Sequence, residues 1–314
     1  MNKGESCVTQ KTLRVVASVV TYNRKEMLRK CLLALKSQSY LPERIIIVDN
    51  ASTDGTREML EREFLKDSIF EYLRLPENTG SSGGQYEGVK RAYEEGFDLI
   101  WIMDDDSLPD REALGNLIKN YMRLREKGRS IGAIGSAAFD PDTGELSWRL
   151  WGVRKGKIYE RWEELGSEVV RVQHLPFIGF AVPREVVEEI GFPEKRFFIW
   201  GEDIEYSQRI RLTGRSIFVV KTSKIYHPVG KGKRVKFLGR EFLLLAGNTA
   251  PWKDYYLARN YILTVRKYGI VPRGYFVGLG RLLLNLMVKD RKLPRAIHSL
   301  TGFVHGLMDR GGKR

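Results

Sequence analysis

Three consecutive carboxylates stand directly after residues 99–103, an apolar segment that is typical of a buried strand. Like charges repel one another and resist burial, so this arrangement favours a bound cation. Because alternate side chains of an extended chain point the same way, Asp104 and Asp106 can share one divalent metal ion while Asp105 faces elsewhere. The alternative interpretation is a solvated acidic loop.

The residues before the acidic triplet alternate between strand-like and helical patterns with short connections. This alternation predicts a doubly wound, mostly parallel sheet with ligands at the carboxyl ends of its strands. Asn23, Asp49, Asn78 and Asp104 all sit at those predicted ends. The predicted strands are residues 13–20, 44–48, 70–75 and 99–103; the predicted helices are 25–39, 57–64 and 85–95, the last preceded by a glycine-rich loop at 77–84.

The rest of the chain has a mixed pattern that ends in helices. We expect residues 1–12 to be loose, residues 13–240 to form the domain that carries the site, and residues 241–314 to form a C-terminal helical region. The predicted strands are 131–138, 146–151, 169–175 and 216–220, the predicted helices are 183–190, 202–213, 255–268, 275–289 and 294–308, and residues 231–236 are a predicted basic loop.

Composition narrows the class of protein. The chain has 314 residues and a net charge of +14, which favours a polyanionic partner such as nucleic acid, nucleotide phosphates or an anionic membrane. Its two cysteines, Cys7 and Cys31, form neither a disulfide framework nor a zinc motif, so we expect a cytoplasmic setting. We expect no signal peptide and no membrane-spanning helix.

The polar residues at the strand ends suit a nucleotide. The Asp49 carboxylate can accept the imide N–H of uracil or thymine, and the Asn23 amide can pair with either base edge. Ordinary turn chemistry is the alternative for both residues. Arg24 would touch the nucleotide or simply begin a helix, and Gly84 belongs to a glycine-rich segment that would let the backbone approach a ligand closely.

The ordered motifs resemble the glycosyl transferase family 2 enzymes, which are inverting sugar transferases with the A-type glycosyltransferase fold. The resemblance covers roughly residues 13–230 and is closest to galactofuranosyltransferases, with rhamnosyltransferases next. It rests on the following residues: Val19 to Arg24, Val48 to Thr56, Asn78 to Gly80, Gly83, Gly84, the acidic triplet, Trp200 to Glu205, Tyr226 and His227.

The resemblance implies a uridine or thymidine diphosphate sugar as donor and a glycan or lipid-linked sugar as acceptor. The residues that it implies for donor binding are Thr21, Asn23, Arg24, Asp49, Asn78, Gly84, Asp105 and Trp200. It also implies that His227 is a third metal ligand beside Asp104 and Asp106, although a lone histidine is more often structural. Oxygen ligands and phosphates favour Mg²⁺ or Mn²⁺, and an imidazole shifts the choice towards Mn²⁺.

An inverting transfer needs one general base, and the resemblance assigns that role to Asp203, with Glu202 and Glu205 orienting hydroxyl groups. The alternative is that these acids only stabilise the start of a helix. Trp200 and Gly201 before them favour a sugar platform. Trp151 is another stacking candidate, although core packing explains either tryptophan equally well.

The C-terminal region combines apolar and basic residues. Its helices would rest on an anionic membrane surface, which would make the protein peripheral on the inner face of the membrane, or would form a homo-oligomer interface. The basic loop with Lys231, Lys233, Arg234 and Lys236 would close over the leaving diphosphate, contact lipid, or be solvated.

Three other functions fit less well. A nucleic-acid-binding protein is suggested by the charge, but the acids at the strand ends would repel phosphate, so we expect no nucleic-acid partner. A nucleotidyltransferase would need a glycine-rich basic motif where residues 21–24 stand. A dinucleotide dehydrogenase would need G-x-G-x-x-G after the first strand.

Overall fold

The computed structural model describes residues 13–140, 142–153, 157–228, 233–237, 240–244, 250–268 and 292–314. The expected loose segment 1–12, the helix expected at 275–289 and Lys231 lie outside these residues. The elements are β1 (Val15–Thr21), α1 (Lys25–Lys36), β2 (Arg44–Asp49), α2 (Thr56–Glu63), β3 (Phe70–Arg74), α3 (Gly80–Glu94), β4 (Leu99–Asp104), β5 (Leu108–Pro109), α4 (Ala113–Glu126), β6 (Ile131–Phe139), β7 (Glu145–Trp151), β8 (Ile158–Arg161), β9 (Val169–Val172), β10 (Phe180–Pro183), α5 (Arg184–Ile190), α6 (Glu202–Leu212), β11 (Ser216–Tyr226), β12 (Lys233–Phe237), β13 (Arg240–Leu244), α7 (Trp252–Tyr268) and α9 (Lys292–Leu307).

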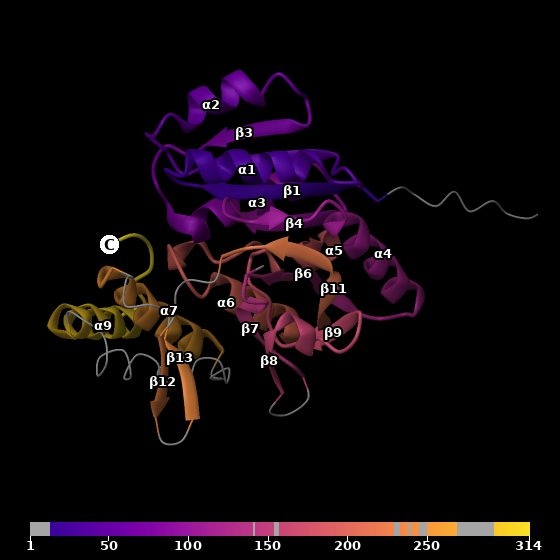
Figure 1. Cartoon of the computed structure of the whole chain (residues 1–314). Helices are drawn as coiled ribbons and strands as arrows, with labels where there is room; N and C mark the ends of the chain where they lie inside the picture. Colours follow the sequence, from indigo (N-terminus) through magenta and orange to yellow (C-terminus); the bar gives the residue numbers. More distant parts are fainter. Residues whose placement is uncertain are drawn as a thin grey trace, which may run out of the picture.

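One large mixed sheet organises the molecule, with strand order β3-β2-β1-β4-β10-β6-β11-β5 (Figure 1). The first four strands in this order are parallel to one another, whereas β10 runs antiparallel to both β4 and β6. Strands β7 and β8 extend from β6, and β9 pairs with β11. The predicted doubly wound, mostly parallel first half is confirmed.

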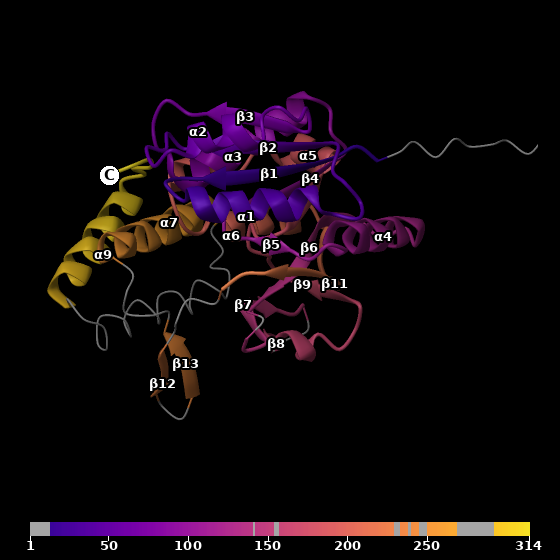
Figure 2. The same ribbon diagram turned by 45° about the horizontal axis from the view of Figure 1, so that its top comes forward.

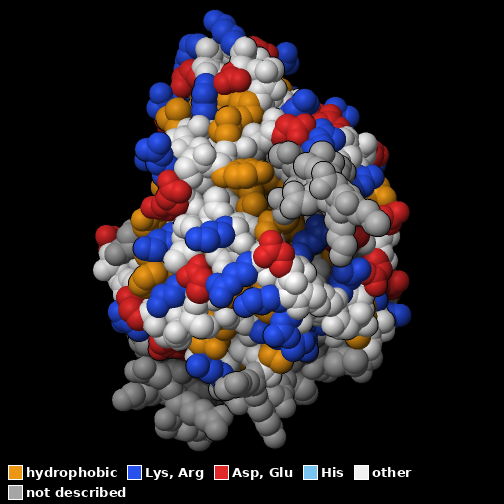
Figure 3. Space-filling model, turned by 90° about the vertical axis from the view of Figure 1, so that its right-hand side faces the viewer, with side chains coloured by type: hydrophobic (Ala, Val, Ile, Leu, Met, Phe, Trp, Pro, Cys, Tyr) orange, Lys and Arg blue, Asp and Glu red, His pale blue; other side chains and the backbone are white. Residues whose placement is uncertain are grey.

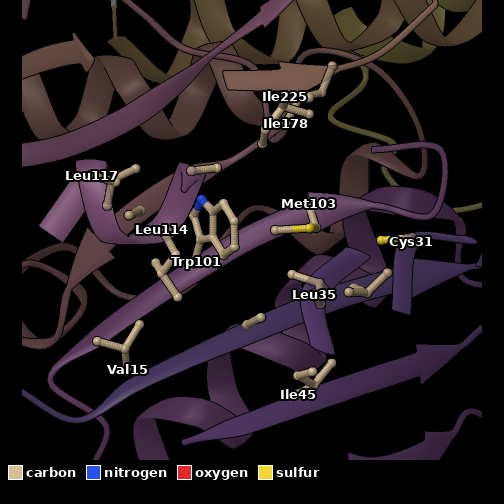
Figure 4. Packing of buried hydrophobic residues seen from close by; sticks show 14 of the residues in the cluster. Val15, Cys31, Leu35, Ile45, Trp101, Met103, Leu114, Leu117, Ile178 and Ile225 are labelled. Carbon is tan, nitrogen blue, oxygen red and sulfur yellow. The ribbon is translucent and has the colours of Figure 1, made fainter. Parts of the chain in front are cut away.

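The alternation of side chains along the central strands builds a core on each face of the sheet. On β4, Trp101 and Met103 pack with Leu35 of α1 and Leu114 of α4 on one face (Figure 4). Ile100 and Ile102 belong to the other core, which α3, α5 and α6 cover. Because both faces are covered, the polar residues at the ends of these strands gather at one edge of the sheet.

The strands β5, β8 and β10 were not predicted, and three other elements differ from the sequence predictions in their bounds or type. Helix α3 begins at Gly80, so the loop expected through residue 84 is wrong in its last five residues. Strand β11 continues to Tyr226, because an irregularity in its pairing with β6 absorbs the polar residues after Val220. Residues 233–237 and 240–244 form a hairpin where a loop was predicted through residue 236.

Helices α7 and α9 lie side by side at one end of the molecule, with α7 nearer the sheet (Figures 1 and 2). They fit the helices predicted at 255–268 and 294–308. None of the helices within the described ranges is long and apolar enough to cross a membrane.

Candidate active site

The ends of three parallel strands place the predicted donor residues side by side. In the strand register Thr21 of β1 is opposite Asp49 of β2, and Val20 is opposite Asp104 of β4. The Thr21 hydroxyl donates a hydrogen bond of 2.7 Å to Asp105 Oδ2. The acidic triplet therefore lies beside the ends of β1 and β2, as the sequence pattern indicated.

The cation that the acidic triplet requires is, in this structure, Arg24 at the start of α1. Its Nη1 atom donates to Asp105 Oδ1 at 3.2 Å and to Asp106 Oδ2 at 2.7 Å. Asp104 has another partner, because Gln85 of α3 donates to its Oδ1 at 3.2 Å. Arg24, which was predicted to touch the nucleotide or begin a helix, begins α1 and pairs with the carboxylates.

The three carboxyl groups differ in acidity because their surroundings differ. Burial and the two neighbouring acids raise the pKa of Asp104 well above its usual range. Burial also raises the pKa of Asp105, to about 6, although Thr21 and Arg24 oppose it. Burial would raise the pKa of Asp106 as well, but contacts with His227 and Arg24 outweigh it and lower that pKa to about 2.

Asp106 and His227 form the best-placed pair for a metal ion. His227 follows the end of β11, and its Nε2 atom lies 3.2 Å from Asp106 Oδ1. Buried polar atoms without hydrogen-bond partners in the described part of the chain surround the triplet: His227 Nδ1, Gln85 Oε1 and Glu202 Oε2. A carboxylate and an imidazole suit Mn²⁺ or Mg²⁺.

The predicted set of three metal ligands is not assembled. Within the residues that the structure describes, no group of three or more His, Cys, Asp or Glu side chains could hold a metal ion. The reason is visible at Asp104, whose carboxyl accepts from Gln85 while Asp106 pairs with Arg24 and His227. The residues thus fit two protein ligands, which is typical of ions that also bind substrate phosphates.

Asp49 is fully buried at the end of β2 and has three partners. Its Oδ1 accepts from the Ser52 amide at 2.8 Å, and its Oδ2 accepts from the Tyr72 hydroxyl at 2.7 Å and Arg74 at 3.0 Å. Asn23 has a left-handed backbone with φ 51°, and its side chain accepts from the Thr53 amide at 2.7 Å. Both side chains thus take part in turns, and Asp49 Oδ2 is also held by Tyr72 and Arg74 of β3.

The glycine-rich segment lets α3 pack closely on the sheet. A Cβ atom at Gly84 would lie 2.5 Å from Val20 Cγ1 and 2.8 Å from Asn50 Nδ2. The Asn78 side chain accepts from the Gly80 amide at 2.8 Å and so shapes the start of the helix. Gly84 is thus explained by helix–sheet contact, which differs from the expected approach to a ligand. Asn50, which the sequence analysis missed, accepts from Thr79 and fixes the same turn.

Glu202 and Asp203 begin α6, and Glu202 lies near the acidic triplet. Ser81 of α3 donates to Glu202 Oε1 at 2.6 Å, and Glu202 is near enough to Asp104 to contribute to its raised pKa. Burial raises the pKa of Glu202. Burial, followed by the charge of Glu202, raises the pKa of Asp203 to about 7. A carboxyl that titrates near neutral pH suits a general base.

Glu205 does not join this pair. Its side chain is fully buried, where Arg209 donates to Oε2 at 3.0 Å and Lys267 donates to Oε1 at 2.9 Å. The Tyr268 hydroxyl also donates to Oε1. The expected role in orienting substrate hydroxyls is therefore replaced by a structural one, because these partners tie α6 to the end of α7.

Helix α7 holds the segment before Glu202, and sequence analysis gave no signal for this. The buried Asn260 amide donates to the carbonyl oxygens of Phe197, Ile199 and Trp200 at 3.0, 2.9 and 2.7 Å. Phe198 and Trp200 have positive φ angles of 66° and 67°, which cost free energy in residues other than glycine. The Asn260 contacts stabilise this unusual backbone.

Lys253 of α7 is a further cation at the site that the sequence analysis did not identify. Its Nζ atom lies 5.5 Å from the centre of the Trp200 ring. Burial, and secondly the charge of Arg24, lower the pKa of Lys253, which places it within electrostatic reach of Arg24. Trp200 thus borders the site, whereas Trp151 is on β7.

Curated relatives of the chain include sugar transferases. The chain is 28% identical over 239 residues to galactofuranosyltransferase GlfT1 of Mycolicibacterium smegmatis, which covers 72% of this chain and 74% of the relative. The GlfT1 of Mycobacterium tuberculosis is 29% identical over 224 residues, covering 70% and 71%. Glycosyltransferase AglE of Haloferax volcanii is 23% identical over 214 residues, covering 66% and 64%.

Solved structures with the same fold include two other sugar transferases. GalNAc-T7, solved with UDP, GalNAc and Mn²⁺, has a TM-score of 0.60 and 15% identity, and the match covers 96% of this chain and 57% of that one. Mannosyltransferase PcManGT from Pyrobaculum calidifontis, solved with GDP-Man and Mn²⁺, has a TM-score of 0.56 and 17% identity, with 95% and 88% covered. Residues 17–181, just over half of the chain, match the model of Glycosyl transferase family 2. The chain is therefore a glycosyltransferase that belongs to glycosyl transferase family 2 and has the A-type fold.

Proposed function

We propose that this enzyme moves a sugar from a nucleoside diphosphate donor to an acceptor hydroxyl with inversion, in a reaction that depends on a divalent metal ion. The observation that carries the proposal is Glu202 near the acidic triplet with Asp203 next to it, the pKa of Asp203 being raised to about 7. One base on the acceptor side is what a single displacement requires. Residues 13–240 would form the catalytic domain and residues 241–314 the helical region that completes it.

In the proposed reaction Asp203 accepts the proton of the acceptor hydroxyl as its oxygen attacks the anomeric carbon. The bond from that carbon to the diphosphate oxygen breaks, and the nucleoside diphosphate leaves with the electron pair. Glu202 orients the hydroxyl groups of acceptor or donor. The Trp200 ring provides an apolar face for a sugar.

The donor would lie over the ends of β1, β2 and β4. Asp49 and Asn23 would bind the base, with Thr21 and Asp105 nearer the ribose or sugar. Asn78 and Gly84 shape the wall at α3, and Arg24 is free to exchange a carboxylate for a phosphate because its side chain is half exposed. These assignments follow from the strand register and remain proposals.

Asp106 and His227 would hold the metal ion, with Asp104 as the third candidate. When bound, Mn²⁺ or Mg²⁺ would stabilise the negative charge of the departing diphosphate. Buried atoms of this pair without a hydrogen-bond partner among the described residues, Asp106 Oδ1 and His227 Nδ1, leave polar groups available for the metal, the donor or its water.

Uridine diphosphate galactofuranose is the favoured donor, because two galactofuranosyltransferases are 28% and 29% identical to most of the chain. Thymidine diphosphate rhamnose is the alternative. The acceptor would be a glycan or a lipid-linked sugar in polysaccharide synthesis, which would place the enzyme on the cytoplasmic face of the membrane. A panel of nucleotide sugars, each tested for metal-dependent hydrolysis, distinguishes the donors.

Isothermal titration with uridine diphosphate tests the site. We expect binding that needs Mn²⁺ or Mg²⁺, and Asp106→Ala should lose this binding because it removes one of two protein ligands. Asp142→Ala, a control change of an exposed aspartate, should bind normally.

The variant Asp203→Asn tests the base. It should keep the affinity for nucleotide and lose transfer. Metal-independent binding, or full activity of Asp203→Asn, would refute the assignment.

A further inference from the structure

Helix α9 exposes its apolar residues and buries its polar ones, the reverse of an ordinary surface helix. Leu293 and Leu300 are 72% and 66% exposed, whereas Arg295 is 1% exposed. The outward apolar face of α9 consists of Leu293, Ile297, Leu300, Phe303, Val304, Leu307 and Met308. An exposed apolar row of this length marks an interaction surface.

Specific contacts with α7 fix the orientation of α9 about its helix axis. The same contacts therefore determine which residues of α9 face outward. Arg295 forms a buried ion pair of 2.8 Å with Asp254. The Tyr255 hydroxyl and His305 Nδ1 are 2.8 Å apart. A Cβ atom at Gly302 would lie 2.2 Å from the Tyr255 carbonyl oxygen, so the two helix backbones touch there. If α9 turned its apolar face inward, the buried Asp254 carboxylate would lose its Arg295 partner, which would cost free energy.

Charge indicates what covers the outward face. Arg310 and Lys313 follow α9 and are exposed, as is the acidic Asp309, whereas Arg314 lies against the Tyr255 ring of α7. The chain as a whole carries a net charge of +14. Cations beside an apolar row are typical of helices that lie in the surface of an anionic membrane. The face of the molecule seen in Figure 3 is different: Lys and Arg mix there with Asp and Glu, and hydrophobic side chains show only in small separate patches.

The outward face is one narrow ridge along a helix of 16 residues, which is about 24 Å long. A membrane accepts a narrow ridge because side chains enter the lipid individually.

We infer that the outward apolar face of α9 docks on an anionic membrane surface, with Arg310 and Lys313 at the lipid headgroups. The inference goes beyond the proposed transfer reaction and does not depend on the identity of the donor. It assigns the contact with the membrane to α9, which contains none of the proposed catalytic or donor-binding residues.

Co-sedimentation of the full chain with vesicles tests the inference. We expect binding to vesicles of phosphatidylcholine with phosphatidylglycerol, and weaker binding to phosphatidylcholine alone. The double variant Leu300→Glu and Phe303→Glu should lower the partition coefficient about tenfold or more, because two apolar contacts are replaced by charges that anionic lipid repels. The double variant Leu33→Glu and Leu41→Glu, which changes exposed leucines at α1 and the loop after it, should bind like the wild type.

Two measurements keep the inference separate from the proposed function. Titration with uridine diphosphate reports on folding and on the donor site of every variant, and it should not change with Leu300 or Phe303. Light scattering after gel filtration reports on self-association. Absence of wild-type binding to anionic vesicles would overturn the inference, as would equal loss in both double variants. A dimer that the Leu300 and Phe303 changes dissociate, without any vesicle binding, would assign the face to a second copy instead.

Discussion

At the scale of single residues, the acidity of Asp203 gives the most direct prediction. Because burial and Glu202 raise its pKa to about 7, only part of the enzyme holds the base ionised at neutral pH. We expect kcat for transfer to rise with pH, by up to about tenfold per unit below this pKa, and to level off above it. Initial rates between pH 5 and 9 at saturating donor and metal check this profile.

The same raised pKa affects stability, and the sign is opposite to that of a salt-bridged aspartate. The folded protein retains the Asp203 proton to a higher pH than the unfolded chain does, so ionisation costs stability as pH rises from about 4 to about 7. Asp203→Asn should therefore raise the melting temperature more at pH 8 than at pH 5. A rate without pH dependence in this range, together with an equal change in melting temperature at both pH values, would contradict the base assignment.

The limits of sequence reasoning at this scale are clear from the acids of α6. Glu202, Asp203 and Glu205 lie within four residues of one another and look equivalent in the sequence. Glu202 lies near the triplet with Asp203 as its charged neighbour, whereas Glu205 is bonded elsewhere. The partners that separate Glu205 from them, Lys267 and Tyr268, come from the far end of α7. No local spacing could reveal a contact across more than sixty residues.

At the scale of elements, α7 positions the catalytic segment through Asn260. Removal of this amide in Asn260→Ala leaves three carbonyl oxygens without their shared donor and releases the strained backbone of Phe198 and Trp200. We expect kcat to fall about tenfold or more, because the displaced segment leads directly into Glu202 and Asp203 and contains Trp200, the proposed sugar contact. The dissociation constant for uridine diphosphate should stay unchanged, because that nucleotide lacks the sugar. Steady-state kinetics and nucleotide titration measure the two quantities.

A matched control separates positioning from general destabilisation. Asn120 is also a buried asparagine whose amide donates two hydrogen bonds, but it is on α4, away from the site. Asn120→Ala should lose about 1–3 kcal/mol of stability, as expected for an unsatisfied buried partner, with little effect on kcat. If both variants lower kcat in proportion to their loss of stability, Asn260 has only a structural role.

Elements with a strong hydrophobic pattern could be predicted from the sequence. Elements were predicted less well where a residue type, such as glycine, is compatible with both a loop and a helix or strand. Residues 99–103 were read as a strand because all are apolar, and β4 confirms this. Gly80 and Gly84 were read as a loop because glycine disfavours helices, but α3 needs them in order to approach Val20 and the Phe198 carbonyl. The strand end at Val220 was misplaced because polar residues follow it, although β11 continues beyond them to Tyr226.

At the scale of the whole molecule, α7 connects two surfaces. One side of the helix holds the Trp200 segment through Asn260, and the other packs on α9 through Tyr255 and Asp254. A membrane-bound α9 would therefore set the position of the catalytic segment relative to the lipid. The fold class could be predicted from the sequence. The connection from α9 through α7 to the Trp200 segment could not, because the sequence pattern of one helix does not indicate which other helix it contacts.

This connection predicts a difference between acceptors in solution and acceptors in lipid. Docking raises the effective concentration of a lipid-linked acceptor near Asp203, but it gives no advantage with a water-soluble acceptor that carries the same sugar. The double variant Leu300→Glu and Phe303→Glu should therefore lose about tenfold in kcat/KM with the acceptor in anionic vesicles and little with the soluble one. Parallel transfer assays with both acceptors, and with the Leu33 and Leu41 double variant as control, measure the ratio. An equal loss with both acceptors would mean that the changes act on the catalytic segment through α7, and not through the membrane.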